Sequence, residues 1–68
     1  MTATIRVNGR DENLAAATVA ELLHLRGIDR PRGVAVAVNG AVVPARRWTE
    51  VALAPGDAVE IVKPFGGG

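Results

Sequence analysis

The chain has 68 residues, among them eight Lys or Arg, seven Asp or Glu, one His and no Cys. The net charge of +1, with charges scattered along the sequence, argues against a nucleic-acid-binding protein, which needs a basic face and aromatic platforms. Without cysteine there are no disulfides, thiolate metal sites or cysteine nucleophiles, and a single histidine does not make a metal site. A chain this short buries about 60% of its unfolded surface, so we expect one small domain.

The sequence shows no segment for secretion or membrane insertion. The residues from Met1 to Arg6 lack the basic stretch and following apolar region that mark a secretory signal. No apolar run approaches the ~20 residues needed to cross a bilayer. We therefore expect a soluble protein of the cytoplasm that contacts no membrane.

The N-terminal segment predicts a β-hairpin. From Thr2 to Val7, apolar and polar residues alternate, which is the period of a strand with one buried face. The dipeptide Asn8-Gly9 is typical of a two-residue turn in which both residues take a positive φ. A short return strand over 10–14 completes the hairpin.

A short helix is expected next, with Val19, Leu22 and Leu23 on its apolar face. Thr18 and Glu21 form a capping-box pattern. In this pattern the Thr18 hydroxyl accepts from the Glu21 amide, and the Glu21 carboxylate reaches back to the Thr18 amide. Gly27 is placed to end the helix in the left-handed conformation, with Ile28 making an apolar contact beyond it. A helix this short needs a sheet to pack on.

Two further strands are predicted after the helix. Residues 34–38 alternate valine with alanine, so this strand is apolar on both faces. A second Asn-Gly turn, Asn39-Gly40, leads into a short strand over 41–43. Pro44 ends that strand because it lacks the amide proton that strand pairing uses.

The remaining segment predicts a connection and one last strand. Arg46-Arg47-Trp48 is expected in a turn or single helical turn, with Trp48 covering one end of the sheet. Leu53 is expected in the core. After a tight turn at Pro55-Gly56-Asp57, the strand over 58–62 places Val59 and Ile61 on one face.

The order of these elements indicates an α+β fold. A right-handed crossover places the strand after the helix parallel to one of the first two strands, in a mixed sheet with the helix across one face. This arrangement is similar to the β-grasp (ubiquitin-like) fold. We expect residues 1–63 to form the domain and residues 64–68 to form a flexible C-terminal glycine tail.

The tail is the feature that bears most on function. It consists of Phe65 and three glycines, which follow Lys63-Pro64. Glycine has no Cβ, so a run of glycines can thread a narrow channel. A carboxylate on Gly68 becomes a good acyl donor when an enzyme joins it to a nucleotide as a mixed anhydride. The tail therefore favours a protein whose own C-terminus is the substrate, and a frayed end without function is the simpler alternative.

Three motifs together resemble the ThiS-type sulfur carriers of thiamine biosynthesis, which are small β-grasp proteins that end in Gly-Gly. Each motif is common by itself, but the three in this order on so short a chain are specific, and the resemblance covers the full length. They are Thr18-Val19-Ala20-Glu21-Leu22-Leu23, Ala37-Val38-Asn39-Gly40-Ala41-Val42-Val43-Pro44 with Arg46 and Trp48, and Pro55-Gly56-Asp57-Ala58-Val59-Glu60-Ile61-Val62 before the glycines.

The resemblance implies a carrier that performs no catalysis itself and binds no cofactor or metal. Its C-terminal carboxylate, on Gly68, would be adenylated by an E1-like adenylyltransferase that uses ATP. Sulfur from a cysteine desulfurase pathway would convert it to a thiocarboxylate, which thiazole synthase consumes. Gly67 and Gly68 match the terminal pair of the family. Gly66 and Phe65 depart from its pattern, and Phe65, Gly66 and Gly67 are expected to thread the partners' channels.

The sheet face away from the helix is expected to bind these partners. If the valines of the strands face the helix, alternation sends four residues to the other face, namely Ala35, Ala37, Ala58 and Val62. One helix covers a single face, so these residues would form an exposed apolar patch, which usually marks a binding site. We expect the activating enzyme and the synthase to use this patch in turn. A second copy of the chain is the alternative occupant.

Three alternative functions share parts of the pattern. The small subunit of molybdopterin synthase has the same fold and Gly-Gly end, although the short connection over 27–33 favours the thiamine carrier. A ubiquitin-like protein modifier would use the same activated terminus to form isopeptide bonds with lysines. A non-catalytic β-grasp interaction domain would leave the tail without a role.

Other charged residues are interpreted as solvent-exposed. His24 falls opposite the apolar face of the helix, which does not suit a catalytic role. Arg30 and Arg32 lie between the helix and the next strand, and like Arg46 they are expected in solvent or against a partner. Lys63, the single lysine, stands at the base of the tail.

Overall fold

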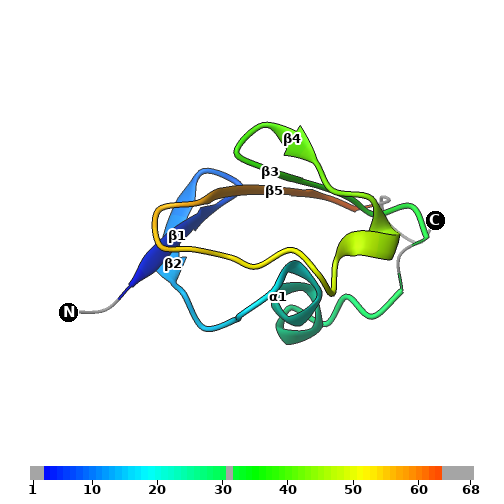
Figure 1. Cartoon of the computed structure of the whole chain (residues 1–68), viewed down its shortest axis with the longest axis horizontal. Coiled ribbons are helices and arrows are strands. Elements are labelled where there is room, and N and C mark those ends of the chain that lie inside the picture. The colour runs from blue at the N-terminus through cyan, green and yellow to red at the C-terminus, as the bar shows by residue number, and fades with distance from the viewer. Residues whose placement is uncertain (1–2, 31, 64–68) are drawn as a thin grey trace.

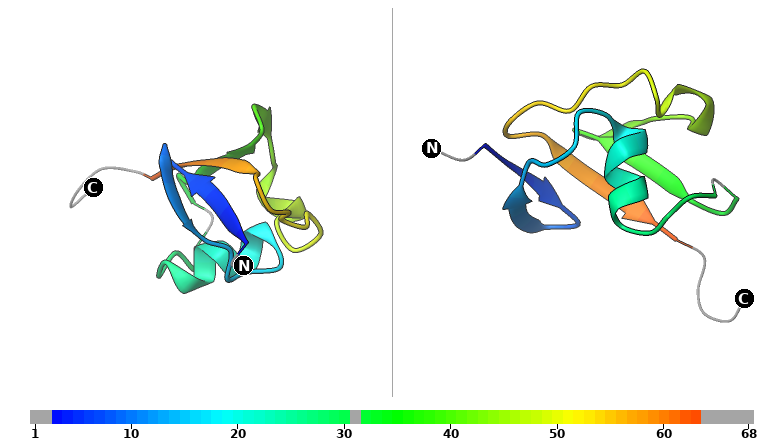
Figure 2. Two further views of the ribbon diagram at one scale, coloured as in Figure 1. Left: turned by 90° about the vertical axis from the view of Figure 1, so that its left-hand side faces the viewer. Right: turned by 90° about the horizontal axis from the view of Figure 1, so that it is seen from below.

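The computed structural model describes residues 3–30 and 32–63; Met1, Thr2, Pro31 and residues 64–68 lie outside the described part. A five-stranded sheet in the order β2-β1-β5-β3-β4 is covered on one face by one helix, as predicted (Figures 1 and 2). The elements are β1 (Thr4–Val7), β2 (Arg10–Asn13), α1 (Val19–Leu25), β3 (Ala35–Val38), β4 (Ala41–Val42), the 3-10 helix η1 (Ala45–Arg47) and β5 (Ala58–Val62). No helix of the described residues is long and apolar enough to span a membrane.

The last strand in the sequence is the central strand of the sheet. β5 pairs with β1 in parallel, with Val7 opposite Val59, and with β3 antiparallel, with Val36 opposite Ile61. β3, which follows the helix, therefore runs in the direction of β2, from which it is separated by two strands. The strand after the helix is thus parallel to one of the first two strands, as predicted, while the strand that pairs with β1 in parallel is the last one, β5.

Both Asn-Gly turns form as predicted, and their asparagine side chains hold β5. Asn8 and Asn39 each have a φ of 51°, and the glycines that follow each have a φ of 84°. The Asn8 side chain accepts from the Ile61 amide at 2.8 Å and donates to the Ile61 carbonyl at 3.2 Å. The Asn39 side chain accepts from the Ala58 amide at 2.9 Å. Each side-chain amide thus takes the place of a backbone partner beside the central strand.

The start of α1 confirms half of the predicted capping box and corrects the other half. The Thr18 hydroxyl accepts from the Glu21 amide at 3.2 Å, as expected. The Glu21 carboxylate, however, accepts from the amide of Ala17 at 2.9 Å and not from that of Thr18. Thr18 is extended (φ −133°, ψ 167°) and forms a β-bridge with Ala52. The backbone amide within reach of the Glu21 carboxylate is therefore that of Ala17, the residue before Thr18.

The end of α1 is a Schellman motif. The Gly27 amide donates to His24 at 3.0 Å and the Ile28 amide donates to Leu23 at 2.8 Å, which gives partners to two carbonyls of the last turn. Gly27 has a φ of +78°, which a residue with a Cβ rarely adopts. Ile28 packs on the core just beyond this turn, as predicted.

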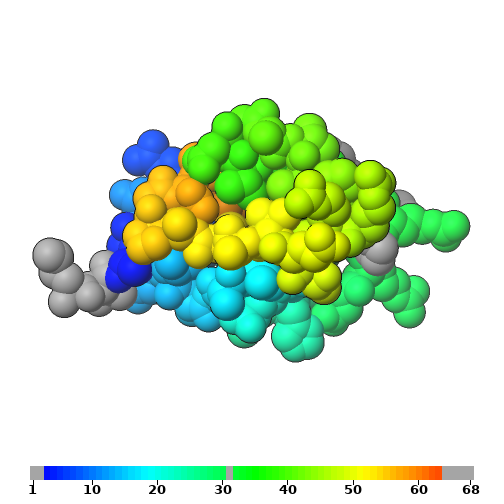
Figure 3. Space-filling model, in the orientation of Figure 1, coloured from blue at the N-terminus to red at the C-terminus, as the bar shows by residue number. Residues whose placement is uncertain are grey.

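The connection over 43–57 closes the gap between sheet and helix. Trp48 is buried, and its indole N–H donates to the Val43 carbonyl at 2.9 Å. The carbonyls of Trp48 and Val51 accept from the amides of Ala20 and Val19, two donors that the first turn of a helix leaves without partners. Figure 3 shows the later part of this segment (yellow) as a band between β3 and β4 (green) and the residues of the helix (cyan).

The core lies between the sheet and this cover. Its buried residues are Ile5, Val7, Ala16, Val19, Leu22, Leu23, Val36, Val43, Trp48, Leu53, Val59 and Ile61. Most of the residues that the sequence analysis turned toward the helix are among them, whereas Val34 and Val38 are only partly buried and pack against this core. None of the buried residues in the described part of the chain is polar or charged, so burial is purely apolar.

Candidate functional site

The predicted site has a part that the structure describes and a part that it does not. The tail residues Phe65, Gly66, Gly67 and Gly68 lie outside the described residues. Lys63, at the root of the tail, directly follows β5. Because β5 is bonded to β1 on one side and to β3 on the other, the chain enters the tail from the middle of the sheet.

The predicted docking patch lies on the outer face of the sheet, which we define as the face away from α1. Ala35 pairs with Val62, and Ala37 pairs with Val42 on the neighbouring strand, so these four side chains share that face. Ala35 is exposed and Ala37 half-buried, while Val62 and Val42 expose 61% and 77% of their surface. We refer to these four residues as the outer apolar patch.

The fourth predicted patch residue, Ala58, is exposed on the same face but apart from the outer apolar patch. Glu60 lies between Ala58 and Val62 on β5 and pairs with Ala37. Ala58 itself pairs with Arg6, whose guanidinium lies 3.3 Å from the carboxylate of Asp11. The outer face is therefore apolar over β3, β4 and the end of β5, and polar over β1 and β2.

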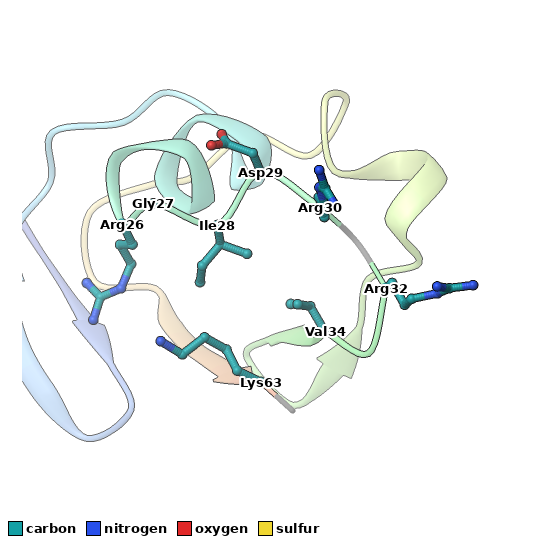
Figure 4. Close-up of a pocket in the computed structure, with 8 residues that line it drawn as sticks. All are labelled: Arg26, Gly27, Ile28, Asp29, Arg30, Arg32, Val34 and Lys63. Atoms are coloured by element: carbon teal, nitrogen blue, oxygen red, sulfur yellow. The ribbon is translucent and has the colours of Figure 1, made fainter. Parts of the chain in front are cut away.

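On the helix side, a hollow adjoins the root of the tail. Its volume is ≈ 490 Å³, and it is lined by Arg26, Gly27, Ile28, Asp29, Arg30, Arg32, Val34 and Lys63 (Figure 4). The lining comes from the end of α1, the loop to β3 and the end of β5. We refer to this feature as the basic hollow.

The other charged residues singled out from the sequence are exposed. The side chain of His24 is 75% exposed and lies 2.7 Å from Asp29, which agrees with its assignment to the solvated face. Arg46 and Arg47 are exposed on η1 and do not line the basic hollow. The part of the chain that the structure describes contains no group of three potential metal-ligating side chains.

Sequence reasoning missed two features of the site. Val42 belongs to the outer apolar patch, and the Asn39-Gly40 turn could have shown this, since a two-residue turn places residues 37 and 42 opposite each other. The basic hollow was also missed, because it joins Lys63 to residues 26–34, and no local pattern indicates that contact.

Comparison with known proteins identifies a family. The model of the ThiS family matches residues 5–68 of the chain. A thiazole synthase from Paramagnetospirillum magneticum is 43% identical over 63 residues, which are 91% of this chain and 19% of that protein. The chain thus spans about a fifth of the length of this curated relative.

Two solved structures share the fold over nearly the whole chain. The crystal structure of a thiamine biosynthesis protein (ThiS) from Geobacter metallireducens superposes with a TM-score of 0.76 at 31% identity, covering 96% of this chain and 99% of that one. The solution structure of a thiamine biosynthesis protein from the same organism gives a TM-score of 0.77 at 31% identity, covering 96% and 87% of the two chains. These similarities confirm the predicted β-grasp fold.

Proposed function

The chain belongs to the ThiS family of sulfur carriers of thiamine biosynthesis, and from this premise we propose how its C-terminus carries sulfur. The carboxylate of Gly68 attacks the α-phosphorus of ATP on a partner enzyme, releasing pyrophosphate and forming an acyl adenylate. A sulfur nucleophile at the oxidation level of sulfide then displaces AMP, and the resulting thioacid loses its proton to leave a thiocarboxylate on Gly68. The thiocarboxylate is a stronger nucleophile than the carboxylate and donates its sulfur for thiazole formation.

The observation that carries this proposal is the family match, which runs from residue 5 to the terminal glycine at 68. The match includes the glycine run that sequence reasoning had identified as the reactive end. No catalytic group is required of this chain, because the partner enzymes supply the nucleotide and the sulfur. ATP is accordingly a substrate of the activating partner and not a cofactor of the carrier.

Three partners follow from this chemistry, all in the cytoplasm. They are an E1-like adenylyltransferase, a sulfur donor from a cysteine desulfurase pathway, and thiazole synthase. The similarity to a stretch of a protein named thiazole synthase favours that consumer over molybdopterin synthase. The same activated terminus is chemically able to form isopeptide bonds with lysines, so a protein modifier is the second candidate. Covalent adducts between the chain and lysines of other proteins would favour it.

The role of the folded domain is to hold the tail so that its end can enter the active site of a partner enzyme. Six extended residues from Lys63 to Gly68 span roughly 20 Å, enough to carry the terminus into a deep active site while the domain stays outside. Phe65, Gly66 and Gly67 thread the channel in this proposal. The exposure of Ala35, Val62 and Val42 around the half-buried Ala37 supports the outer apolar patch as the surface on which the domain docks. Ala58 lies on the same face but beyond Glu60, apart from this patch.

The mass of the protein purified from its host tests the proposal. We expect a fraction of the molecules to be heavier by the replacement of one oxygen with sulfur, with the change confined to the C-terminal peptide. A chain lacking Gly67 and Gly68 serves as the control and should show no such fraction. If the unaltered chain never carries the additional mass, even when the pathway is active, the carrier function is wrong.

A glycine substitution tests the threading of the tail. Gly67→Ala adds a Cβ where the proposed channel has no room, so adenylation should fall strongly, as measured by ATP–pyrophosphate exchange. The thermal melt should be unchanged, because position 67 follows the last strand, Ala58–Val62, in the sequence. A normal exchange rate for this variant would contradict the narrow channel.

A further inference from the structure

Basic residues are concentrated beside the root of the tail, although the net charge of the whole chain is only +1. Four of the eight basic residues of the chain line the basic hollow, namely Arg26, Arg30, Arg32 and Lys63, against one of the seven acidic residues, Asp29. Three of these basic residues lie close together in the sequence, between positions 26 and 32. The fold brings this segment against the end of β5, so that Lys63 joins them and half of the basic residues line one hollow.

Some of the charged residues of the basic hollow form ion pairs within the chain, and others do not. The Arg26 guanidinium donates to both carboxylate oxygens of Glu12, at 2.9 and 3.0 Å, which ties the helix end to β2. Asp29 is engaged by His24. Among the ion pairs of residues 3–30 and 32–63, none involves Arg30, Arg32 or Lys63. Three basic residues of the lining therefore form no ion pair in the described part of the chain, although the Arg32 side chain is directed outward from the hollow (Figure 4).

The centre of the basic hollow is apolar. Figure 4 shows Ile28 and Val34 pointing into it, while Lys63 extends along one side from the end of β5 and Arg32 points away from it. Both apolar residues are only partly buried. The hollow is wide and open, so its shape fits a segment of another protein better than an enclosed small molecule. An apolar centre with a cationic rim complements a bulky apolar side chain flanked by carboxylates.

We propose that the basic hollow docks an acidic segment, carrying one bulky apolar side chain, of the enzyme that adenylates the tail. This inference rests on the proposed function and adds to it the charge and position of the contact. An enzyme that draws in residues 64–68 must come to lie against Lys63, which is itself part of the hollow. The unpaired cations there would then find their counter-charges at the entrance of the enzyme's channel.

This contact is separate from the outer apolar patch. Val62 and Lys63 are neighbours in the sequence, and Val62 belongs to the outer apolar patch while Lys63 lines the hollow on the helix side. The root of the tail is thus flanked by an apolar surface and by a cationic one. Opposite charges across an interface speed encounter and fix orientation, and their effect weakens as salt screens them.

The test is the steady-state kinetics of ATP–pyrophosphate exchange with the purified adenylyltransferase of the same organism. The variant Arg30→Glu/Arg32→Glu reverses two rim charges without touching the tail or the Arg26–Glu12 pair. The matched control Arg46→Glu/Arg47→Glu makes the same change in charge on η1, outside the hollow. All four arginines are exposed, so both variants should fold, which a thermal melt verifies.

We expect the rim variant to raise the KM for the carrier at least about tenfold at low salt, with kcat within about twofold, since the charges act on encounter and docking. The control should change KM by less than about twofold, and salt should shrink the difference between the variants. The docking proposal would be overturned if the Arg30→Glu/Arg32→Glu variant had the same KM as the unaltered chain, or if only its kcat fell. It would also be overturned if the control variant raised KM by the same factor.

Direct binding separates this proposal from the adenylation itself. If the unaltered chain supports no exchange at any concentration, the proposed function fails, and the Kd for the enzyme without ATP then tests the hollow. A Kd weakened at least about tenfold by the rim substitutions, and not by the control, supports docking in that case too. Equal Kd values for all three chains overturn it. If the double variant does not fold, Arg30→Gln serves with a smaller expected shift.

Discussion

The two faces of the sheet carry similar apolar residues at very different exposure. On the inner face, Val59 and Ile61 are 1% and 8% exposed beneath α1 and the connection over 43–57. On the outer face, Val62 and Val42 remain 61% and 77% exposed. The difference follows from the single helical layer, which covers one face only. Neighbouring residues of one strand therefore differ sharply in burial, and under the docking proposal we expect substitutions on the two faces to separate stability from binding.

The sharpest test of this separation makes the same substitution on both faces of β5. Val59→Ala removes two buried methyl groups and should lower the free energy of unfolding by about 2–3 kcal/mol, from transfer and cavity terms together. Val62→Ala, three residues further along, should change it by less than about 0.5 kcal/mol. Chemical denaturation of the two variants measures both values. Equal losses would mean that the outer face is covered in the folded protein.

A second test concerns the side-chain amide that holds the end of β5 in the sheet. Asn8→Gly keeps the positive φ of the turn but removes both hydrogen bonds to Ile61, and should cost about 1–2 kcal/mol. Hydrogen exchange of the Ile61 amide should accelerate in this variant more than that of Val59. Unchanged protection at Ile61 would show that the backbone alone fixes the strand.

The helix that creates the inner face depends on its cap. Thr18→Ala removes the hydroxyl that accepts from the Glu21 amide and should cost about 1 kcal/mol. In a domain whose total stability is about 5–15 kcal/mol, a thermal melt should resolve this loss. Because Thr18 is far from the outer apolar patch in the fold, binding of the partners by the folded variant should not change. A melt identical to that of the parent would contradict the cap.

The smallest effect on stability is expected on the outer face itself. Ala37 lies opposite Glu60, so Ala37→Lys introduces a charge with a favourable cross-strand neighbour, whereas a glutamate there would face another carboxylate. The free energy of unfolding should change by less than about 0.5 kcal/mol. Binding to the adenylyltransferase and to thiazole synthase should weaken at least about tenfold, because the interface would have to strip water from the new ammonium group and make room for a long side chain. Unaltered binding to both enzymes would exclude the outer apolar patch as their docking surface.

Much of the fold could be predicted because its signals are local. The two Asn-Gly turns, the Thr18 cap and the Gly27 stop each depend on a few adjacent residues, and the structure places each where the sequence indicates. Alternation assigned the inner face correctly for the same reason, since the period of a strand is fixed by its backbone.

What could not be predicted depends on contacts between distant residues. The central position of β5 depends on contacts with strands far away in the sequence. The hydrogen bond between Asn8 and Ile61, for example, joins residues more than 50 positions apart. The Glu21 carboxylate accepts from the Ala17 amide because Thr18 forms a β-bridge with Ala52. No local sequence pattern indicates that bridge. The basic hollow exists only after Lys63 is placed beside the loop that follows α1.

The central position of β5 also has a mechanical consequence. Any force applied to the chain beyond Lys63 acts along β5, whose hydrogen bonds to β1 and β3 lie across the direction of pull. Such a load is shared by the bonds on both sides of the strand in shear, whereas an edge strand peels away one bond at a time. The domain is therefore built to withstand traction on its C-terminal end without unravelling from that end.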